Sequence, residues 1–151
     1  MKYKTINELE HFDFSDAYIA EIQKSSSSFS MTLDNVKILP DNSCNRDIRI
    51  MRTNQLLLQL PEAAITAFTE EGYKVYDADG RLLRQEKDRL LAVSEYQDAC
   101  KELTGCTIYS LEKQDGVYQI SIDTEDHTYL IQVKGSCDTE EWERFLNLDS
   151  M

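Results

Sequence analysis

Apolar and polar residues alternate along the first third of the chain. In residues 17–22 (AYIAEI) and 29–33 (FSMTL), apolar side chains recur at every second position, so they fall on one face. This period of two is typical of a half-buried β-strand. Residues 24–28 (KSSSS) are polar and lie between the two runs. The pattern therefore predicts a β-hairpin.

Similar short runs recur through the rest of the chain, separated by turn residues. Asp77–Gly80 and Asp115–Gly116 are typical of tight hairpin turns. Residues 40–43 (PDNS) form a strand-to-strand connection, because Pro fixes its own φ and Asn and Ser side chains bond nearby backbone. The further predicted strands are residues 36–39, 48–51, 56–60, 73–76, 81–83, 107–111, 117–122 and 128–133.

Two segments have helical features. Residues 94–97 have the spacing of a capping box, and apolar residues then recur at helical intervals up to Leu103, before Gly105. Residues 138–146 begin with carboxylates, which suit a helix N-terminus, and place Trp142 and Phe145 on one stripe. Both are predicted to be helices. Residues 61–71 fit either a helix or a strand, and the β-rich surroundings favour a strand.

These elements together predict one α+β domain that spans residues 1–151. Its expected architecture is a largely antiparallel sheet of about seven to ten strands, strongly curved or folded into two layers, with two covering helices.

The chain is acidic, with 28 acidic and 16 basic residues and a formal net charge of −12. This charge repels phosphate backbones and anionic lipid surfaces, so neither a nucleic acid nor a membrane is an expected partner, whereas a basic protein is. Residues 112–151 contain ten acidic and three basic residues, which predicts an acidic end. The chain has no apolar run of membrane-spanning length, and its first residues lack the apolar core of a secretory signal, so a cytoplasmic location and reduced thiols are expected.

The stretch NSCNRD, residues 42–47, brings Cys44, Arg46 and Asp47 together. A nucleophilic cysteine needs a base, and the chain has only two histidines, His11 and His127. The loop also lacks the glycines and the strand-turn-helix context of known nucleophiles. We therefore interpret it as a polar connection in which Arg46 and Asp47 pair or face water, and we predict no catalytic residue.

A metal site is a further alternative. The stretch DTEDH offers Asp123, Glu125, Asp126 and His127 to a divalent ion. Carboxylates are, however, also common at hairpin tips because these tips are solvated. The four cysteines, at positions 44, 100, 106 and 137, contain no CxxC pair. Neither a metal nor a cofactor is expected, and both stretches remain candidate contacts for a ligand or partner.

Two longer segments, EGYKVYDADGRLL and GVYQISIDTEDHTYLIQVKGSCDTEEWERFLNL, are similar to a family of small acidic proteins from anaerobic Firmicutes. The shared motifs are turns and packing residues. No activity is known for that family, so the resemblance implies no function.

Three functional hypotheses follow. The first is a non-enzymatic, acidic protein-binding domain, for example an immunity-type protein that neutralises a basic toxin by electrostatic complementarity. The second is a small-molecule module or enzyme with a cavity lined by Tyr18, Phe29, Tyr76 and Tyr118, and with Cys44 or Arg46 at its mouth. The third is self-association through an unpaired sheet edge. The sequence leaves the oligomeric state open.

Overall fold

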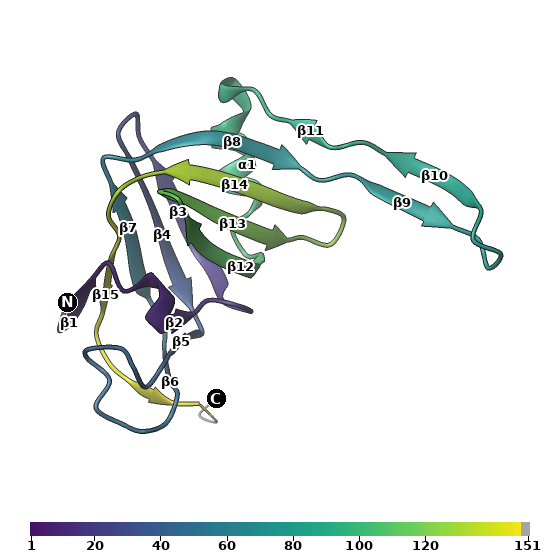
Figure 1. The fold of residues 1–151 in the computed structure, drawn as a ribbon. Coiled ribbons are helices and arrows are strands. Elements are labelled where there is room, and N and C mark those ends of the chain that lie inside the picture. The colour runs from purple at the N-terminus through teal and green to yellow at the C-terminus, as the bar shows by residue number, and fades with distance from the viewer. Residues whose placement is uncertain (149–151) are drawn as a thin grey trace.

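A computed structural model describes residues 1–148 of the chain (Figure 1). Its largest element is one antiparallel sheet, which confirms the predicted sheet-rich architecture. In spatial order its ten strands are β1 (Tyr3–Ile6), β15 (Thr139–Trp142), β7 (Leu56–Pro61), β4 (Ser28–Asp34), β3 (Tyr18–Lys24), β12 (Thr107–Gln114), β13 (Val117–Asp123), β14 (Thr128–Lys134), β8 (Ala64–Glu70) and β11 (Arg89–Leu90). The predicted turns at residues 24–28 and 115–116 join the hairpins β3–β4 and β12–β13.

The sheet is strongly curved, and its two halves bury one core. The strands β3 and β12 share one residue pair, Tyr18 opposite Thr107, and further backbone hydrogen bonds between residues 16–19 and 105–108 join the two halves there. Apolar side chains from both halves enter the same buried cluster, for example Phe29 and Leu58 from one half and Ile120 and Ile131 from the other. Within residues 1–148 the sheet does not close into a barrel, because β1 and β11 remain its two edges.

A second, four-stranded sheet lies at the lower end of the body in Figure 1. Its order is β16 (Leu146–Asn147), β6 (Met51–Thr53), β5 (Val36–Ile38) and β2 (Phe12–Asp13). Asn35 between β4 and β5 and Gln55 between β6 and β7 have positive φ, at 59° and 57°. These two kinks let neighbouring strands leave the large sheet together and continue as the small one.

A two-stranded hairpin projects from the body (Figure 1). It consists of β9 (Tyr73–Tyr76) and β10 (Leu82–Glu86), which continue β8 and lead to β11. Residues 73–87 are called the arm below. The predicted strand, turn and strand over residues 73–83 are confirmed. Asp77 forms the turn, because its Oδ1 accepts the amide hydrogens of Asp79 at 2.9 Å and Arg81 at 2.8 Å.

The first predicted helix is confirmed and the second is wrong. The helix α1 (Tyr96–Glu102) follows a 3-10 turn at Val93–Glu95 and buries Tyr96 and Cys100 against the sheet. A second 3-10 turn spans Leu9–His11. Residues 138–146, expected to be helical, instead form β15 and lead to β16. The prediction of two covering helices therefore does not hold.

The C-terminal segment is a strand because its side chains alternate between the core and the surface. Asp138, Glu140 and Trp142 are buried, at 1%, 0% and 0% exposure, whereas Glu141 faces outward. The strand β15 fills the gap between β1 and β7 and pairs with both. Carboxylates are typical of a solvated helix end, so the sequence alone does not reveal that Asp138 and Glu140 follow the period of two.

Two further predictions concern short segments. Residues 61–71 contain the strand β8, as the β-rich surroundings indicated. The strand expected at residues 48–51 begins only at Met51, and Ile48 is 93% exposed in the preceding loop. A turn in which Asp47 accepts the backbone amide hydrogen of Arg49 shapes this part of the loop. Among the described residues, no helix has the length and apolarity needed to cross a membrane.

Candidate functional site

Two buried asparagines hold the loop that carries the candidate residues of NSCNRD. The side-chain amide of Asn45 donates to three backbone carbonyl oxygens at 3.1 to 3.2 Å. The Oδ1 atom of Asn42 accepts the amide hydrogen of Cys44 at 2.9 Å. The two side-chain amides therefore have a structural role. They form hydrogen bonds with backbone groups in or next to the loop, which has no neighbouring strand to pair with in the described part of the chain.

The three reactive side chains of this loop have separate surroundings. The Cys44 thiol donates to the carbonyl oxygen of Lys4 at 3.7 Å. Asp47 pairs with Arg49, whose Nη2 and Nε atoms lie 3.0 and 3.2 Å from the carboxylate, and not with Arg46. The hydrogen bond from the Arg49 side chain holds the pKa of Asp47 below its ordinary value. Arg46 is exposed. Asp47 therefore does not act as an orienting acid for Cys44.

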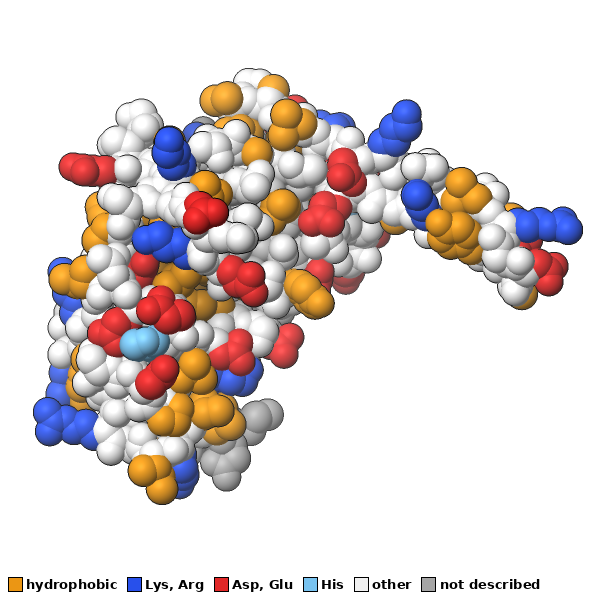
Figure 2. Space-filling model, in the orientation of Figure 1, with side chains coloured by type: hydrophobic (Ala, Val, Ile, Leu, Met, Phe, Trp, Pro, Cys, Tyr) orange, Lys and Arg blue, Asp and Glu red, His pale blue; other side chains and the backbone are white. Residues whose placement is uncertain are grey.

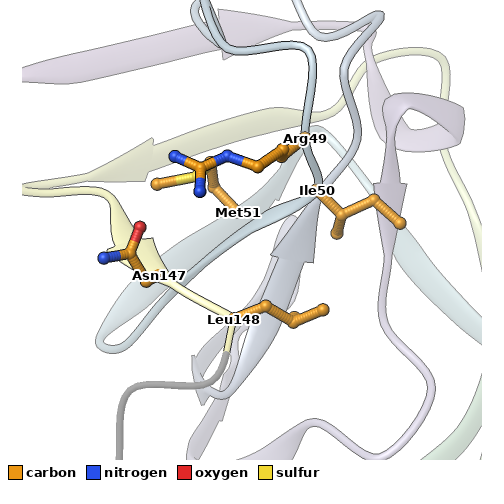
Figure 3. Close-up of a pocket in the computed structure, with 5 residues that line it drawn as sticks. All are labelled: Arg49, Ile50, Met51, Asn147 and Leu148. Carbon is orange, nitrogen blue, oxygen red and sulfur yellow. The ribbon is translucent and has the colours of Figure 1, made fainter.

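The same loop borders two adjoining hollows. One, of about 780 Å³, is lined by Tyr3, Cys44, Asn45, Arg46, Asp47, Ile48, Met51 and Phe145. The other shares Met51 and is lined also by Arg49, Ile50, Asn147 and Leu148. Figure 3 shows that Ile50 and Leu148 point to the same side of their segments. Apolar side chains and arginines thus meet at this end of the molecule, and Cys44 and Arg46 do line a common hollow.

A serine, a carboxylate and a histidine meet beside this loop, but in an order that does not suit nucleophilic catalysis. The Ser43 hydroxyl donates to Glu8, and Glu8 Oε1 lies 3.2 Å from Nδ1 of His11. The carboxylate therefore lies between the hydroxyl and the imidazole. A catalytic triad needs the imidazole in the middle, because it must take the hydroxyl proton. Partial burial raises the pKa of Glu8, but hydrogen bonds from Ser43 and His11 outweigh it and keep the pKa low.

Two of the four cysteines, Cys100 and Cys106, have surroundings that disfavour a reactive thiol. All four are unpaired. Burial raises the pKa of Cys100, and burial together with the charge of Glu125 raises the pKa of Cys106. A raised pKa disfavours the thiolate, which is the nucleophilic form.

The candidate metal ligands of the turn after β13 point apart. Thr124 shapes the turn, since its hydroxyl oxygen accepts the amide hydrogen of His127 at 2.9 Å. The Nε2 atom of His127 lies 3.9 Å from Glu70, and the ring lies between Tyr73 and Tyr129. The Oδ1 atom of Asp123 accepts the hydroxyl hydrogen of Thr128, and Glu125 and Asp126 are exposed. Within residues 1–148 no group of three potential ligands is placed to hold a metal ion.

The four aromatic residues expected to line a cavity lie apart. Phe29 and Tyr118 are fully buried in the core. Tyr18 is exposed on β3, and Tyr76 is exposed on the arm. The interior of the curved sheet holds the packed apolar cluster described above. The cavity proposed from these aromatics therefore does not form.

A groove with acidic groups at its rim lies between the start of the chain and β12. It has a volume of about 610 Å³, and its apolar lining is Leu9, Phe12, Phe14, Leu39, Tyr109 and Leu111. The other lining residues are Glu10, Asp13, Ser15, Ser110, Glu112 and Lys113. Segments that are about 100 residues apart in the chain thus form one surface. This surface is called the acidic groove below.

The charge of the groove is negative. Burial raises the pKa of Asp13, but the hydroxyl and amide of Ser15 at 2.6 and 2.9 Å, together with the charge of Lys37, outweigh this effect and keep its pKa low. The Lys37 ammonium group also donates to the Ser15 carbonyl oxygen at 3.4 Å. Glu10 and Glu112 are exposed. The ammonium group of Lys113 is directed at the Ser136 carbonyl oxygen, at 3.5 Å, and lies over a tyrosine ring. The groove thus combines an apolar floor with three carboxylates.

The sequence did not indicate this groove, and the expected acidic end is divided. Asp138 and Glu140 belong to the acidic C-terminal part but lie in the core. The turns at Asp115–Gly116 and at residues 124–127 are at opposite ends of β13. Of the acidic residues after position 111, Glu112 lines the groove. The other two carboxylates come from the N-terminal part.

The two buried carboxylates form a polar cluster in the core. The hydroxyl groups of Tyr118 and Thr5 donate to Asp138 Oδ1 at 2.7 Å and to Glu140 Oε1 at 2.6 Å. The remaining oxygens, Asp138 Oδ2 and Glu140 Oε2, have no other donor within the described chain. Burial and then hydrogen bonding to Asp138 raise the pKa of Glu140 to about 9. A hydrogen bond between two carboxyl groups needs a proton on one of them, and the raised pKa places that proton on Glu140.

Comparisons with known proteins add no relative. No protein-family model matches the chain, and no match was found among curated proteins or solved structures. The similarity to small acidic proteins of anaerobic Firmicutes therefore remains a prediction. Any function must be inferred from the acidic groove and its surroundings.

Proposed function

We propose that this chain is a non-enzymatic, cytoplasmic protein-binding domain that holds a basic segment of a partner protein in the acidic groove. The observation that carries this proposal is the combination of an apolar floor with the carboxylates of Glu10, Asp13 and Glu112. A partner segment with apolar and basic side chains complements both features. Charge complementarity of this kind speeds association and excludes acidic competitors. A basic toxin bound by an immunity-type protein would be one such pair.

The chemistry of the remaining candidates supports a binding role. Cys44 contacts a backbone carbonyl group, and Glu8 separates Ser43 from His11. A general base must reach the proton that it takes. The described part of the chain thus offers no assembled nucleophile and base, whereas the groove needs no chemistry beyond recognition.

The test is a pull-down from the lysate of the native organism at low and at moderately high salt. The bait is compared with the double variant Glu10→Lys/Glu112→Lys and with a control, Glu62→Lys/Glu125→Lys, which has the same change in charge outside the groove. We expect a basic protein that the wild type and the control retain and that the groove variant loses. Salt should release it, because ions screen exposed charges. Its affinity is then measured by calorimetry with the purified partner. Equal retention by all three baits, or no retained basic protein, would contradict the proposal.

A second candidate function is suggested by the hollow beside NSCNRD. Cys44 and Arg46 line this hollow together with Tyr3 and Phe145. An arginine next to aromatic rings suits a planar anionic ligand, since guanidinium groups bind carboxylates and phosphates in pairs of hydrogen bonds. Thermal unfolding with a panel of aromatic carboxylates and nucleotides tests this candidate. A shift that is present in the wild type and lost in Arg46→Gln would support it.

A further inference from the structure

Most side chains of the arm are exposed to solvent. All of its residues except Tyr73 and Asp77 are exposed, and these two are only half-buried. The large apolar residues Tyr76, Leu82 and Leu83 are 54%, 51% and 64% exposed. A two-stranded hairpin alone is only marginally stable in water. Contiguous exposed apolar residues are also typical of interaction sites.

The base of the arm nevertheless makes close contacts with the neighbouring chain segments. A Cβ atom at Gly72 would lie 2.0 Å from the carbonyl oxygen of Glu86, so the two chains approach closely there. The Gly72 amide donates to Asp88 at 2.6 Å, and the Tyr73 ring lies 6.3 Å from that of His127. The base of the arm is therefore held to the body at Gly72 and Tyr73.

The two faces of the arm differ. On one face Arg84 lies over the ring of Tyr73, 5.2 Å from its centroid, and donates to its hydroxyl group at 2.7 Å. The register pairs Tyr76 with Leu82 and Lys74 with Gln85, which places these four residues on the other face. This second face presents Tyr76, Leu82 and the basic Lys74 to the surroundings, and the exposed Arg81 directly precedes Leu82 in the chain.

The arm also differs in charge from the rest of the chain. Residues 73–87 contain four basic and three acidic residues and have a net charge of +1, which leaves −13 for the other residues. Figure 2 shows basic and apolar side chains along the projecting arm, acidic ones near its tip, and many acidic ones on the body. The arm points away from the body in Figure 1 and so cannot reach the groove of its own copy.

We propose that the arm of one copy docks in the acidic groove of a second copy. This inference rests on the proposed role of the groove as a binding site. Tyr76 and Leu82 match the apolar floor, and Lys74 and Arg81 match the carboxylates of Glu10 and Glu112. Each copy has one arm and one groove, and in a dimer with two-fold symmetry both contacts form together.

The test is sedimentation velocity from low micromolar to submillimolar concentration, with charge reversals on both sides. We expect a concentration-dependent dimer for the wild type. The arm variant Lys74→Glu/Arg81→Glu and the groove variant Glu10→Lys/Glu112→Lys should each weaken dimerisation by about 100-fold or more, since close charge pairs across interfaces couple strongly. Combining the four reversals should restore the dimer. Leu82→Ser, which leaves all charges in place, should also weaken it.

Each other outcome overturns the inference. A wild type that stays monomeric at every concentration contradicts it, as does a dimer that the arm variants leave intact. Circular dichroism of each variant confirms folding, which these exposed substitutions should preserve. The proposed function is tested independently of the arm contact. If the groove binds a basic partner, the monomeric arm variant should retain that partner in the pull-down at least as well as the wild type does. A monomeric wild type that still retains that partner would overturn the arm contact alone.

Discussion

Glu140 should make the stability of this protein fall as the pH rises. Its carboxyl group is fully buried, and burial and the neighbouring Asp138 raise its pKa from 4.5 to about 9, against the opposing hydrogen bond from Thr5. In the unfolded chain the group releases its proton near pH 4.5, whereas in the folded chain it keeps the proton. The unfolded state therefore binds fewer protons between these values. Its free energy falls relative to the folded state as the pH rises.

The size of the effect follows from one proton. A difference of one bound proton changes the free energy of unfolding by about 1.4 kcal/mol per pH unit. Between about pH 5 and pH 8 the loss is therefore about 4 kcal/mol. The total free energy of unfolding of a small protein is only about 5 to 15 kcal/mol, so a loss of this size is easily measured.

The variant Glu140→Gln removes the titration and keeps the hydrogen bonds. Its amide can accept from Thr5 and donate to Asp138, as the protonated acid does. Urea unfolding followed by the fluorescence of Trp142, the single tryptophan, gives the free energy at each pH. We expect the free energy of unfolding of the variant to increase relative to that of the wild type by about 1.4 kcal/mol for each unit by which the pH rises. Every other titrating group is present in both proteins, so the difference isolates Glu140.

Glu141→Gln is the matched control, because Glu141 is the next residue of β15 and faces outward. This variant removes one carboxyl group from the same strand and leaves the buried pair of Asp138 and Glu140 in place. Parallel pH profiles for the wild type and Glu140→Gln would refute the reasoning. They would mean that both buried carboxyl groups are charged in the folded chain or that Glu140 is solvated.

Three further substitutions test other parts of the structure. Gly72→Ala places a Cβ atom 2.0 Å from a carbonyl oxygen, so amide exchange should become faster across residues 73–87, as mass spectrometry can show. Asn45→Ala removes the side-chain donor to the carbonyl groups of Ile38, Leu39 and Arg49, of which Leu39 keeps the Asn42 amide, and should cost about 1 to 3 kcal/mol in urea unfolding. Tyr118→Phe removes the 2.7 Å hydrogen bond to Asp138 and should cost a similar amount, about 1 to 3 kcal/mol, by the same measurement. Unchanged values in any of these would contradict the corresponding contact.

The fold was predictable where alternation and turn chemistry agree. In the hairpins β3–β4 and β12–β13, one face is apolar and the connecting residues favour turns, so the burial of a single face determines the structure. The helix α1 was predictable for the same reason with a period of 3.6. At residues 138–142 the sequence predicts a helix and the structure has a strand, because carboxylates normally face water and here two of them are buried. Only the partners Thr5 and Tyr118, far away in the sequence, explain why they do not.

The arm and the loop of NSCNRD show a different limit. The strands of the arm were predicted, but whether they would be covered depends on where the sheet ends. One signal was present: neither face of residues 73–86 is consistently apolar, as a strand packed on a core would be. In NSCNRD the reactive residue types drew attention, whereas the amides of Asn42 and Asn45 determine the conformation.

Charge along the sequence is therefore a poor guide to charge on the surface of this protein. Asp138 and Glu140, in the acidic C-terminal part, are buried, and the raised pKa of Glu140 keeps it neutral near pH 7. The negative surface that combines with apolar side chains is instead assembled from Glu10 and Asp13 next to β2 and Glu112 on β12. Only the fold brings these segments together. The same fold extends a hairpin of opposite charge away from the body, so the two complementary surfaces of one chain can meet only between copies.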